Sequence, residues 1–310
     1  MGIFVLSDTM PEMKLNRIRF FLILTAFALF PVTRAFSQGL FNYAVGGGVM
    51  YYNGDLSDSR PLPPLELMRG YFSADISMLL VDRLDLSLHY LHGNIAGDDA
   101  LSNENDNKVR NQSFFSPIDE VKLMLRLKAF SVKSRLIVNP YAMAGIGYFW
   151  FNPQAELDGK IYELQPLGTE GQFIEGGGYP APYSLSSGSF ALGLGVQIRL
   201  NHNFALRIEG APQLTFTDYL DDTSFKYPDS TALAATPKGS VAVLFASRRE
   251  KGFPDGGRFR GNPDKDDVMV TLGMSLVFTP GSRECKAIPR PGIIRQVFKG
   301  RKGWWGMTPN

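Results

Sequence analysis

Histidine and aspartate side chains that lie close together can transfer protons, and the chain has one such group. His89 and His92 are followed by Asp98 and Asp99. The two histidine residues are three positions apart, and in a regular strand such residues point to opposite faces. We therefore expect His89 to point into the fold and His92 to point away from it. No serine stands in a G-x-S-x-G setting, so the sequence predicts a protein that is not an enzyme and needs no cofactor.

A second group that could do chemistry is the acidic run Asp218, Asp221 and Asp222 in the segment TFTDYLDD. Carboxylates of this kind can bind calcium. Their spacing, however, lacks the D-x-D-x-D-G pattern of a calcium-binding loop. We therefore predict a solvated acidic patch at the rim of the fold rather than a metal site.

Cys285 is the only cysteine of the chain, so no disulfide bond can form within it. Arg283, Lys286 and Arg290 surround this thiol, and nearby cations favour the reactive thiolate. A lone thiol in a secreted protein suggests a partner in another chain, although a chance free thiol is the alternative. In an oxidising compartment we expect an intermolecular disulfide bond from Cys285.

The N-terminus predicts that compartment. A basic segment (MKLNRIR, 13–19) precedes an apolar run (FFLILTAFALF, 20–30) and a small-residue cleavage site (AFSQ, 35–38). This is the pattern of a secretory signal peptide, and the apolar run is too short to span a membrane. We predict a signal peptide over 1–37. The formal net charge of +2 gives no support to nucleic-acid binding.

Strands with alternating apolar and polar residues must position the charged side chains. The segment DEVKLMLRLKAF (119–130) places Leu123, Leu125 and Leu127 on one face, against Lys122 and Arg126 on the other. The segments LDLSLHYL, FALGLGVQIRL and FALRIEGAPQLTF alternate in the same way. This is the period of a half-buried strand, which a soluble sandwich and a membrane barrel share.

The lengths of the connections distinguish the two. Tight turns alternate along the chain with long polar loops, and such an arrangement is typical of outer-membrane barrels. The turns are 81–83, 131–135 and 201–203, and the loops are 53–69, 97–111, 152–182 and 220–265.

Aromatic residues gather at strand ends, as in YFWF (148–151) and FTDY (216–219), where membrane barrels have their girdles. The predicted fold class is therefore all-β, an eight-stranded antiparallel outer-membrane β-barrel with long extracellular loops and a short periplasmic C-terminal tail. Its strands are expected to begin near Phe41, Gly70, Leu84, Gln112, Ile137, Ser184, Phe204 and Asp266.

Eight strands enclose an interior just wide enough for side chains to fill it. The inward positions carry many charged residues, which we expect to form a charge lattice that packs the lumen. A proton or solute path is the alternative. The predicted lattice comprises Asp75, Asp85, His89, Lys122, Arg126, Arg199, Arg207 and Glu209.

Five segments in order also resemble a known family. They are YYNGDL, PYAMAGIGYFWFNP, YELQPLGTEGQ, TFTDYLDD and RGNPDKDD. Together they resemble the Bacteroidetes outer-membrane family that includes PorG, a component of the type IX secretion system. The resemblance implies a non-enzymatic barrel in contact with a periplasmic ring of the PorK lipoprotein and PorN.

The sequence thus predicts a signal peptide (1–37), a barrel (38–280) in the outer membrane with both chain ends in the periplasm, and a basic periplasmic tail (281–310). We expect the barrel to anchor a PorK/PorN-like ring. Cys285 is expected to bond to the PorK-like lipoprotein, and the tail to dock through Arg283, Lys286, Arg290, Trp304 and Trp305. The alternative is a surface module whose long loops bind an external ligand or cover another barrel.

Overall fold

The computed structural model describes residues 41–57, 60, 62–132, 134, 136–250 and 252–280. The predicted signal peptide and tail, including Cys285, Arg283, Lys286, Arg290, Trp304 and Trp305, lie outside these residues. Among the described residues, no helix has both the length and the apolar character that crossing a membrane requires.

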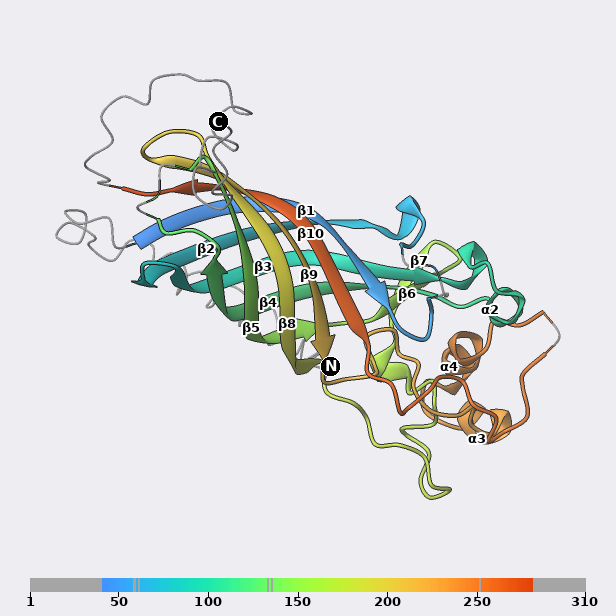
Figure 1. Ribbon diagram of the computed structural model, residues 1–310. Coiled ribbons are helices and arrows are strands. Elements are labelled where there is room, and N and C mark those ends of the chain that lie inside the picture. Colours follow the sequence, from blue (N-terminus) through green and yellow to red (C-terminus); the bar gives the residue numbers. More distant parts are fainter. Residues whose placement is uncertain are drawn as a thin grey trace, which may run out of the picture.

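Eight long antiparallel strands form a closed barrel, which Figure 1 shows from the side. Each strand begins within two residues of its predicted start. The barrel strands are β1 (Phe41–Asn53), β2 (Arg69–Val81), β3 (Leu84–Asp98), β4 (Ser113–Lys128), β5 (Val138–Phe151), β8 (Ser186–Arg199), β9 (Phe204–Thr215) and β10 (Val268–Phe278). The predicted fold class, an all-β eight-stranded barrel, is confirmed.

The first and last strands close the barrel. Strand β1 pairs with β10 from Tyr43 opposite Phe278 to Asn53 opposite Val268, without a break. On the other side, β3 and β4 pair from Leu84 opposite Leu127 to Asp98 opposite Ser113. Closure leaves no free edge among the eight strands, which is what a sheet inside a hydrocarbon layer requires.

Alternation along the strands separates the lumen from the outer face. In β4, the side chains of Leu123, Leu125 and Leu127 are exposed on the outside, whereas Lys122 and Arg126 are buried inside. The pleat of a strand alone produces this separation, because successive side chains point to opposite faces. The outer face is an apolar band, to which β8 contributes Leu192 and Leu194 and β10 contributes Leu272, Met274 and Leu276.

Aromatic side chains border this band at both ends. Phe204 and Phe278 contact each other at one end, with 5.3 Å between ring centroids. Near the other end, Tyr148 and Trp150 pack edge to face on the outside of β5, with 5.3 Å between centroids. Girdles of this kind mark the two interfaces of a membrane barrel.

All the short turns lie at one end of the barrel, and the long loops lie at the other (Figure 1). The first residue of β1 and the last residue of β10 are at the short-turn end. We name the long connections loop 1 (54–68), loop 2 (99–112), loop 3 (152–185) and loop 4 (216–267). The predicted asymmetry of the connections is confirmed.

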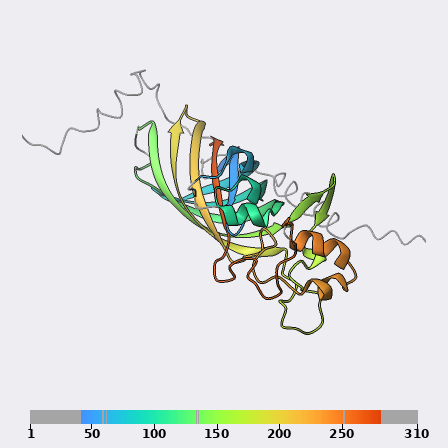
Figure 2. The same ribbon diagram turned by 90° about the vertical axis from the view of Figure 1, so that its right-hand side faces the viewer.

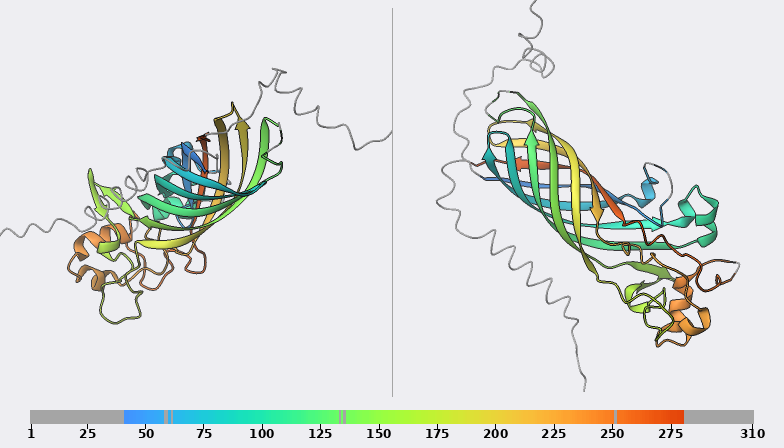
Figure 3. Two further views of the ribbon diagram at one scale, coloured as in Figure 1. Left: turned by 90° about the vertical axis from the view of Figure 1, so that its left-hand side faces the viewer. Right: turned by 60° about the horizontal axis from the view of Figure 1, so that its bottom comes forward.

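The four long loops fold together into a separate layer over their end of the barrel, which we call the dome. Figures 2 and 3 show its helices gathered beyond the strand ends. The elements of the dome are η2 (Leu65–Leu67), η3 (Asp99–Leu101), α2 (Asn105–Arg110), β6 (Gln154–Leu157), β7 (Lys160–Glu163), η4 (Gln165–Leu167), α3 (Ser230–Ala234) and α4 (Gly239–Ala246).

The dome has an apolar core of its own. Leu56, Leu164, Leu220, Leu233 and Phe245 come from loops 1, 3 and 4 and are all buried in one cluster. The same cluster includes buried side chains from the adjoining ends of the barrel strands. They are Met50, Ile95, Phe114, Ile118, Phe149 and Phe151. The loops are therefore packed onto the barrel, and the dome covers its mouth.

Candidate functional site in the lumen and the dome

The centre of the lumen holds an ion-pair network around Asp75. Oδ2 of Asp75 lies 3.0 Å from Nη2 of Arg126, and Oδ1 lies 3.1 Å from Nη1 of Arg207. Nε of Arg126 also lies 2.8 Å from Oε1 of Glu209. The two arginine side chains are only 2% exposed. Buried charges therefore join β2, β4 and β9 across the lumen.

Three residues outside the predicted lattice make further polar contacts in the lumen. Lys128 pairs with Asp85 at 2.6 Å, and Glu120 pairs with Lys122 at 2.9 Å. Tyr141 donates a hydrogen bond of 2.8 Å to Glu209. Glu120 and Lys128 continue the alternation that identified the inward residues of β4, so the pattern could have found them.

Glycine makes room for Tyr141. A Cβ atom on Gly195 in the neighbouring strand would lie 2.3 Å from Cζ of Tyr141. The aromatic ring therefore lies directly over the main chain of Gly195, which a larger residue would prevent. This close approach lets the hydroxyl group reach Glu209.

Two predicted lattice residues are placed differently. Arg199 lies near the short-turn end, where it donates to the main-chain oxygens of Val132 and Ser134 at 3.3 and 3.1 Å, and no carboxylate pairs with it among the described residues. Nδ1 of His89 lies 3.7 Å from Oδ2 of Asp75, at the margin of the network. Arg199 thus stabilises the turn between β4 and β5 and takes no part in the ion pairs at the centre of the lumen.

The candidate histidine–aspartate group does not assemble. His89 points inward, whereas His92 is on the outer face, where its Nδ1 lies 2.8 Å from Oδ1 of Asp119. Asp98 caps η3 by accepting from the main-chain nitrogen of Ala100. The strand wall separates the two imidazole groups, as the three-residue spacing predicted.

The acidic run of TFTDYLDD is buried, and the prediction of a solvated rim patch was wrong. Asp222 is fully buried, and Asp218 and Asp221 are nearly so. The physical reason is that the end of β1 and loop 3 pack against loop 4 and supply donors to Asp221 and Asp222. The acidic run is a structural element inside the dome.

Asp222 joins loop 3 to loop 4. Its carboxylate accepts from the hydroxyl groups of Thr169 and Tyr183, with 2.6 Å to the latter. Arg260 lies 3.6 Å from the same carboxylate and 3.2 Å from Oε1 of Glu170. Burial raises the pKa values of Asp222 and Glu170, and Arg260 opposes this rise.

The main chain of Asp222 has an unusual conformation at this contact between loops 3 and 4. Its φ angle is 66°, in the left-handed region that residues other than glycine seldom occupy. Arg260 also donates to the main-chain oxygen of Asp222. Contacts to the main chain and the side chain together hold the unusual conformation.

Tyr52 joins loop 4 to the end of β1. Its hydroxyl oxygen lies 2.6 Å from Oδ2 of Asp221 and 2.9 Å from Oδ1 of Asp267. Burial, and then the charge of Asp55, raise the pKa of Asp221 to about 8. Burial and the charge of Asp221 likewise raise the pKa of Asp267.

Asp218 lies beside Asp221 and Asp267. Neither oxygen of its own carboxylate has a hydrogen bond of ordinary geometry to a described residue. Burial raises its pKa to about 8, with the charges of Asp55 and Asp221 adding to the effect. Across the part of the chain that the structure describes, no three acidic or histidine side chains converge in a way that could hold a metal ion. Asp221, Asp222 and Asp267, unlike Asp218, accept hydrogen bonds from protein donors.

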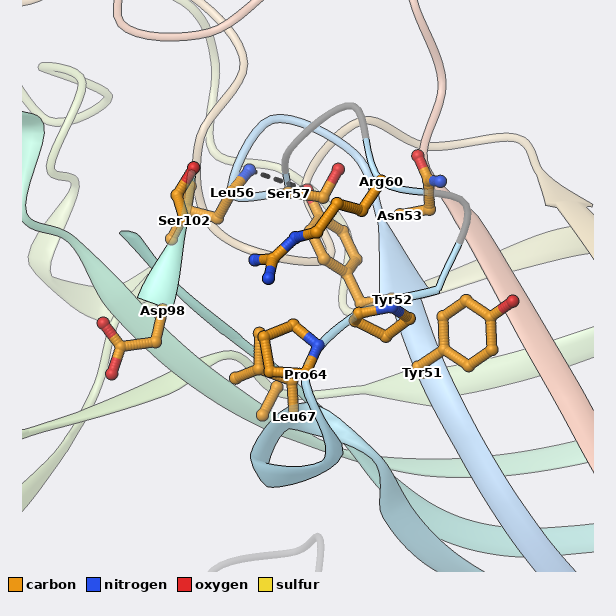
Figure 4. Close-up of a pocket in the computed structure, with 12 residues that line it drawn as sticks. Tyr51, Tyr52, Asn53, Leu56, Ser57, Arg60, Pro64, Leu67, Asp98 and Ser102 are labelled. Atoms are coloured by element: carbon orange, nitrogen blue, oxygen red, sulfur yellow. Dashed lines mark hydrogen bonds between the residues drawn. The ribbon is translucent and has the colours of Figure 1, made fainter. Parts of the chain in front are cut away.

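A small pocket lies between loop 1 and the end of β3. It encloses about 20 Å³, which is about the space that one water molecule needs. Figure 4 shows Arg60 lying across it, with the guanidinium group directed to the side of Ser102 and Asp98. Nη2 of Arg60 donates to the main-chain oxygen of Leu101 at 2.8 Å. The pocket is a packing space between loops and is too small for an organic ligand.

The closed topology, the apolar outer band and the two aromatic girdles define a small outer-membrane β-barrel protein. Solved structures of the same class are similar to it in fold. The structure of Neisserial surface protein A covers 78% of this chain and 97% of its own, at 9% identity and a TM-score of 0.40. A major outer membrane protein of Thermus thermophilus covers 77% and 98%, at 12% identity and a TM-score of 0.35.

The outer membrane protein OprG of Pseudomonas aeruginosa is also similar, covering 78% and 98% at 10% identity and a TM-score of 0.32. The chain matches no protein-family model, and no curated protein matches it at a significant level.

Proposed function

We propose that this protein is a non-enzymatic component of the type IX secretion system that anchors a PorK/PorN-like periplasmic ring at the outer membrane. The observation that carries the proposal concerns the segments that resemble the PorG family. Four of the five segments meet in the dome: Tyr52 of YYNGDL, Glu170 of YELQPLGTEGQ, Asp222 of TFTDYLDD, and Arg260 and Asp267 of RGNPDKDD. Residues far apart in sequence thus form one set of contacts, which supports treating the segments as a single unit.

The ion pairs across the lumen support an anchoring role over a transport role. Four carboxylates and four cations pair with one another inside the barrel, and the dome packs over its mouth. A barrel of eight strands has little interior left once such side chains occupy it. A solute path would need part of this network to open.

On this proposal the ring binds at the short-turn end, which faces the periplasm. The chain leaves β10 at this end and continues into the basic segment 281–310. We propose that Arg283, Lys286, Arg290, Trp304 and Trp305 dock on the ring and that Cys285 bonds to its lipoprotein. The short turns between the strands would form the rest of the contact.

The test is affinity purification of the tagged full-length protein from solubilised membranes. The expected result is recovery of a ring lipoprotein together with its ring subunit, and their loss when 281–310 is removed. The matched control is Asp222→Asn in the dome, which should leave recovery unchanged. Full-length protein that is folded and yet recovers neither ring component would contradict the proposal.

One observation favours the alternative of a surface-binding module. The dome is a folded layer with its own core, and it exposes large apolar side chains at Ile161, Phe173, Leu244 and Phe259. A cap that only closed the barrel would need less structure. If Leu244→Glu and Phe259→Glu abolish the activity of the protein in cells while the ring still co-purifies, that activity depends on the dome rather than on the tail.

A further inference from the structure

The junction of Tyr52, Asp221 and Asp267 contains one hydroxyl proton between two carboxyl groups. The hydroxyl oxygen of Tyr52 is within hydrogen-bond distance of both, at 2.6 and 2.9 Å. A tyrosine hydroxyl donates a single hydrogen bond. It can therefore satisfy one ionised carboxylate, and the other must carry a proton and donate it to the tyrosine oxygen.

The other oxygen atom of each carboxyl group already has a donor. Oδ1 of Asp221 accepts from the main-chain nitrogen of Thr223 at 2.8 Å, and Oδ2 of Asp267 accepts from that of Leu220 at 3.0 Å. The shared proton is thus confined to the side of each group that faces Tyr52. Both carboxyl groups and the tyrosine are buried, so water does not replace the missing donor.

The charges around this junction also favour a bound proton. Asp55 faces Asp221 with like charge, and Asp218 is a further acidic group beside it, which Glu170 faces in turn. Arg110 is the cation that acts on Asp221, but its Nε and Nη2 atoms both bind Asp99 at 2.8 Å. The positive charges of Lys265 and Arg260 lower the pKa of Asp55. Like charges in a buried site disfavour a second ionised group.

We propose that Asp221 and Asp267 share one proton through the hydroxyl group of Tyr52, and that this proton holds both ends of loop 4 onto β1. Asp221 follows the start of loop 4 and Asp267 is its last residue. Loss of the proton leaves two adjacent carboxylates with one donor between them. The dome then opens more readily, so its closure depends on pH.

The sign of this dependence follows from the raised pKa of Asp221, which is about 8 in the closed dome, against about 3.9 for an exposed aspartate. The stabilisation is fully present below about pH 4, and it is lost as the pH rises to about 8. Within this range the junction binds one more proton in the closed dome than in the open dome. It therefore contributes about a tenfold rise per pH unit to the equilibrium constant for opening, and Asp218, whose pKa burial also raises to about 8, acts in the same direction.

Hydrogen exchange of the full-length protein in lipid vesicles measures this opening. The amide groups of Leu220 and Thr223 donate to the two carboxyl groups. Their protection factors should fall at least about tenfold per unit between pH 5 and pH 7, whereas those of the barrel strands should stay constant. Absence of this slope in the native protein would overturn the inference.

Asp221→Asn tests the location of the proton, because the amide can donate to Tyr52 without titrating. This variant should lose one tenfold step per pH unit, and Asp264→Asn, an exposed change in the same loop, should keep the full slope. A slope unchanged in Asp221→Asn would also overturn the inference. Infrared spectra of the native protein at pH 7 provide a readout that needs no variant to fold. They should show the carbonyl band of a buried carboxylic acid, and its absence would contradict the shared proton.

Discussion

Replacing Arg126 by methionine tests whether ion pairs hold the lumen together. The guanidinium group donates to Glu209 at 2.8 Å, to Asp75 at 3.0 Å and to Ser87 at 2.7 Å. Methionine is unbranched and flexible and reaches to the position of the arginine Nε atom, so the change removes the charge and keeps most of the apolar stem. Asp75 then keeps Arg207 as its close ion-pair partner, with His89 at 3.7 Å, and Glu209 keeps the hydroxyl group of Tyr141.

The expected cost follows from the burial of the partners. The side chains of Arg126, Asp75 and Glu209 are 2%, 4% and 18% exposed, so solvent screens the remaining charges weakly. Removing one partner of a buried ion pair costs about 3–5 kcal/mol, because an uncompensated charge stays in the interior. Restoring neutrality with Glu209→Gln should bring the double variant to within about 2 kcal/mol of the native protein.

The assay is urea unfolding in lipid vesicles, followed by the change in electrophoretic mobility between folded and unfolded barrel. Arg199→Met is the matched control, since Arg199 donates only to two main-chain oxygens and its loss should cost about 1 kcal/mol. If Arg126→Met costs no more than this control, or if the double variant is no more stable than the single one, the lumen charges do not act as a buried network.

Three further predictions follow from the faces of the strands and the proposed orientation. Leu194 is 71% exposed on the outer face, so Leu194→Arg should lower the unfolding free energy by about 2–4 kcal/mol, whereas Gln197→Glu on the opposite face should be nearly neutral; equal losses would mean that the facing is wrong. Protease added to intact cells should cut within loop 4 and spare the tail, and rapid cleavage near Trp304 would refute the orientation. Non-reducing electrophoresis after thiol blocking should show a larger, disulfide-bonded species that Cys285→Ser removes. Complete alkylation of Cys285 in cells would mean that this thiol forms no such bond.

The strands could be read from the sequence because a barrel in lipid imposes a two-residue period. In β4, the order Lys122, Leu123, Met124, Leu125 and Arg126 places every second side chain in the lumen, and no other arrangement of the strand would bury these charges away from lipid. The same rule placed the charges of β3 and β9. It does not say which charge pairs with which, because pairing depends on register and on contacts across the lumen.

The dome was not predicted, because its contacts have no local period. Tyr52 and Asp221 are separated by 169 positions, and an acidic run such as Asp221–Asp222 in a polar loop resembles a solvated surface. One signal was present in the apolar residues of these loops, such as Leu220 and Phe245, which are buried. Apolar side chains at intervals along long loops indicate a packed layer.

The segment YFWF contains both a feature that was predicted, the outer girdle, and one that was not, the core beneath the dome. Tyr148 and Trp150 lie on the outer face, where the girdle was expected. Phe149 and Phe151 point the other way and belong to the core beneath the dome. The alternation of the strand continues beyond the membrane band, so a single aromatic run serves the lipid interface and the loop layer at once.

The distance in sequence between the residues of the Tyr52 junction has a consequence for the order of folding. Tyr52 belongs to the first strand, and Asp267, 215 positions later, immediately precedes the last one. Contacts of such long sequence separation form late, since the intervening chain must be ordered first. The junction can close only after β10 has paired with β1, and its closure marks the completion of the barrel. A chain that stops before the last strand would retain loops that cannot fold, with Leu220 and Phe245 exposed to proteases and to aggregation.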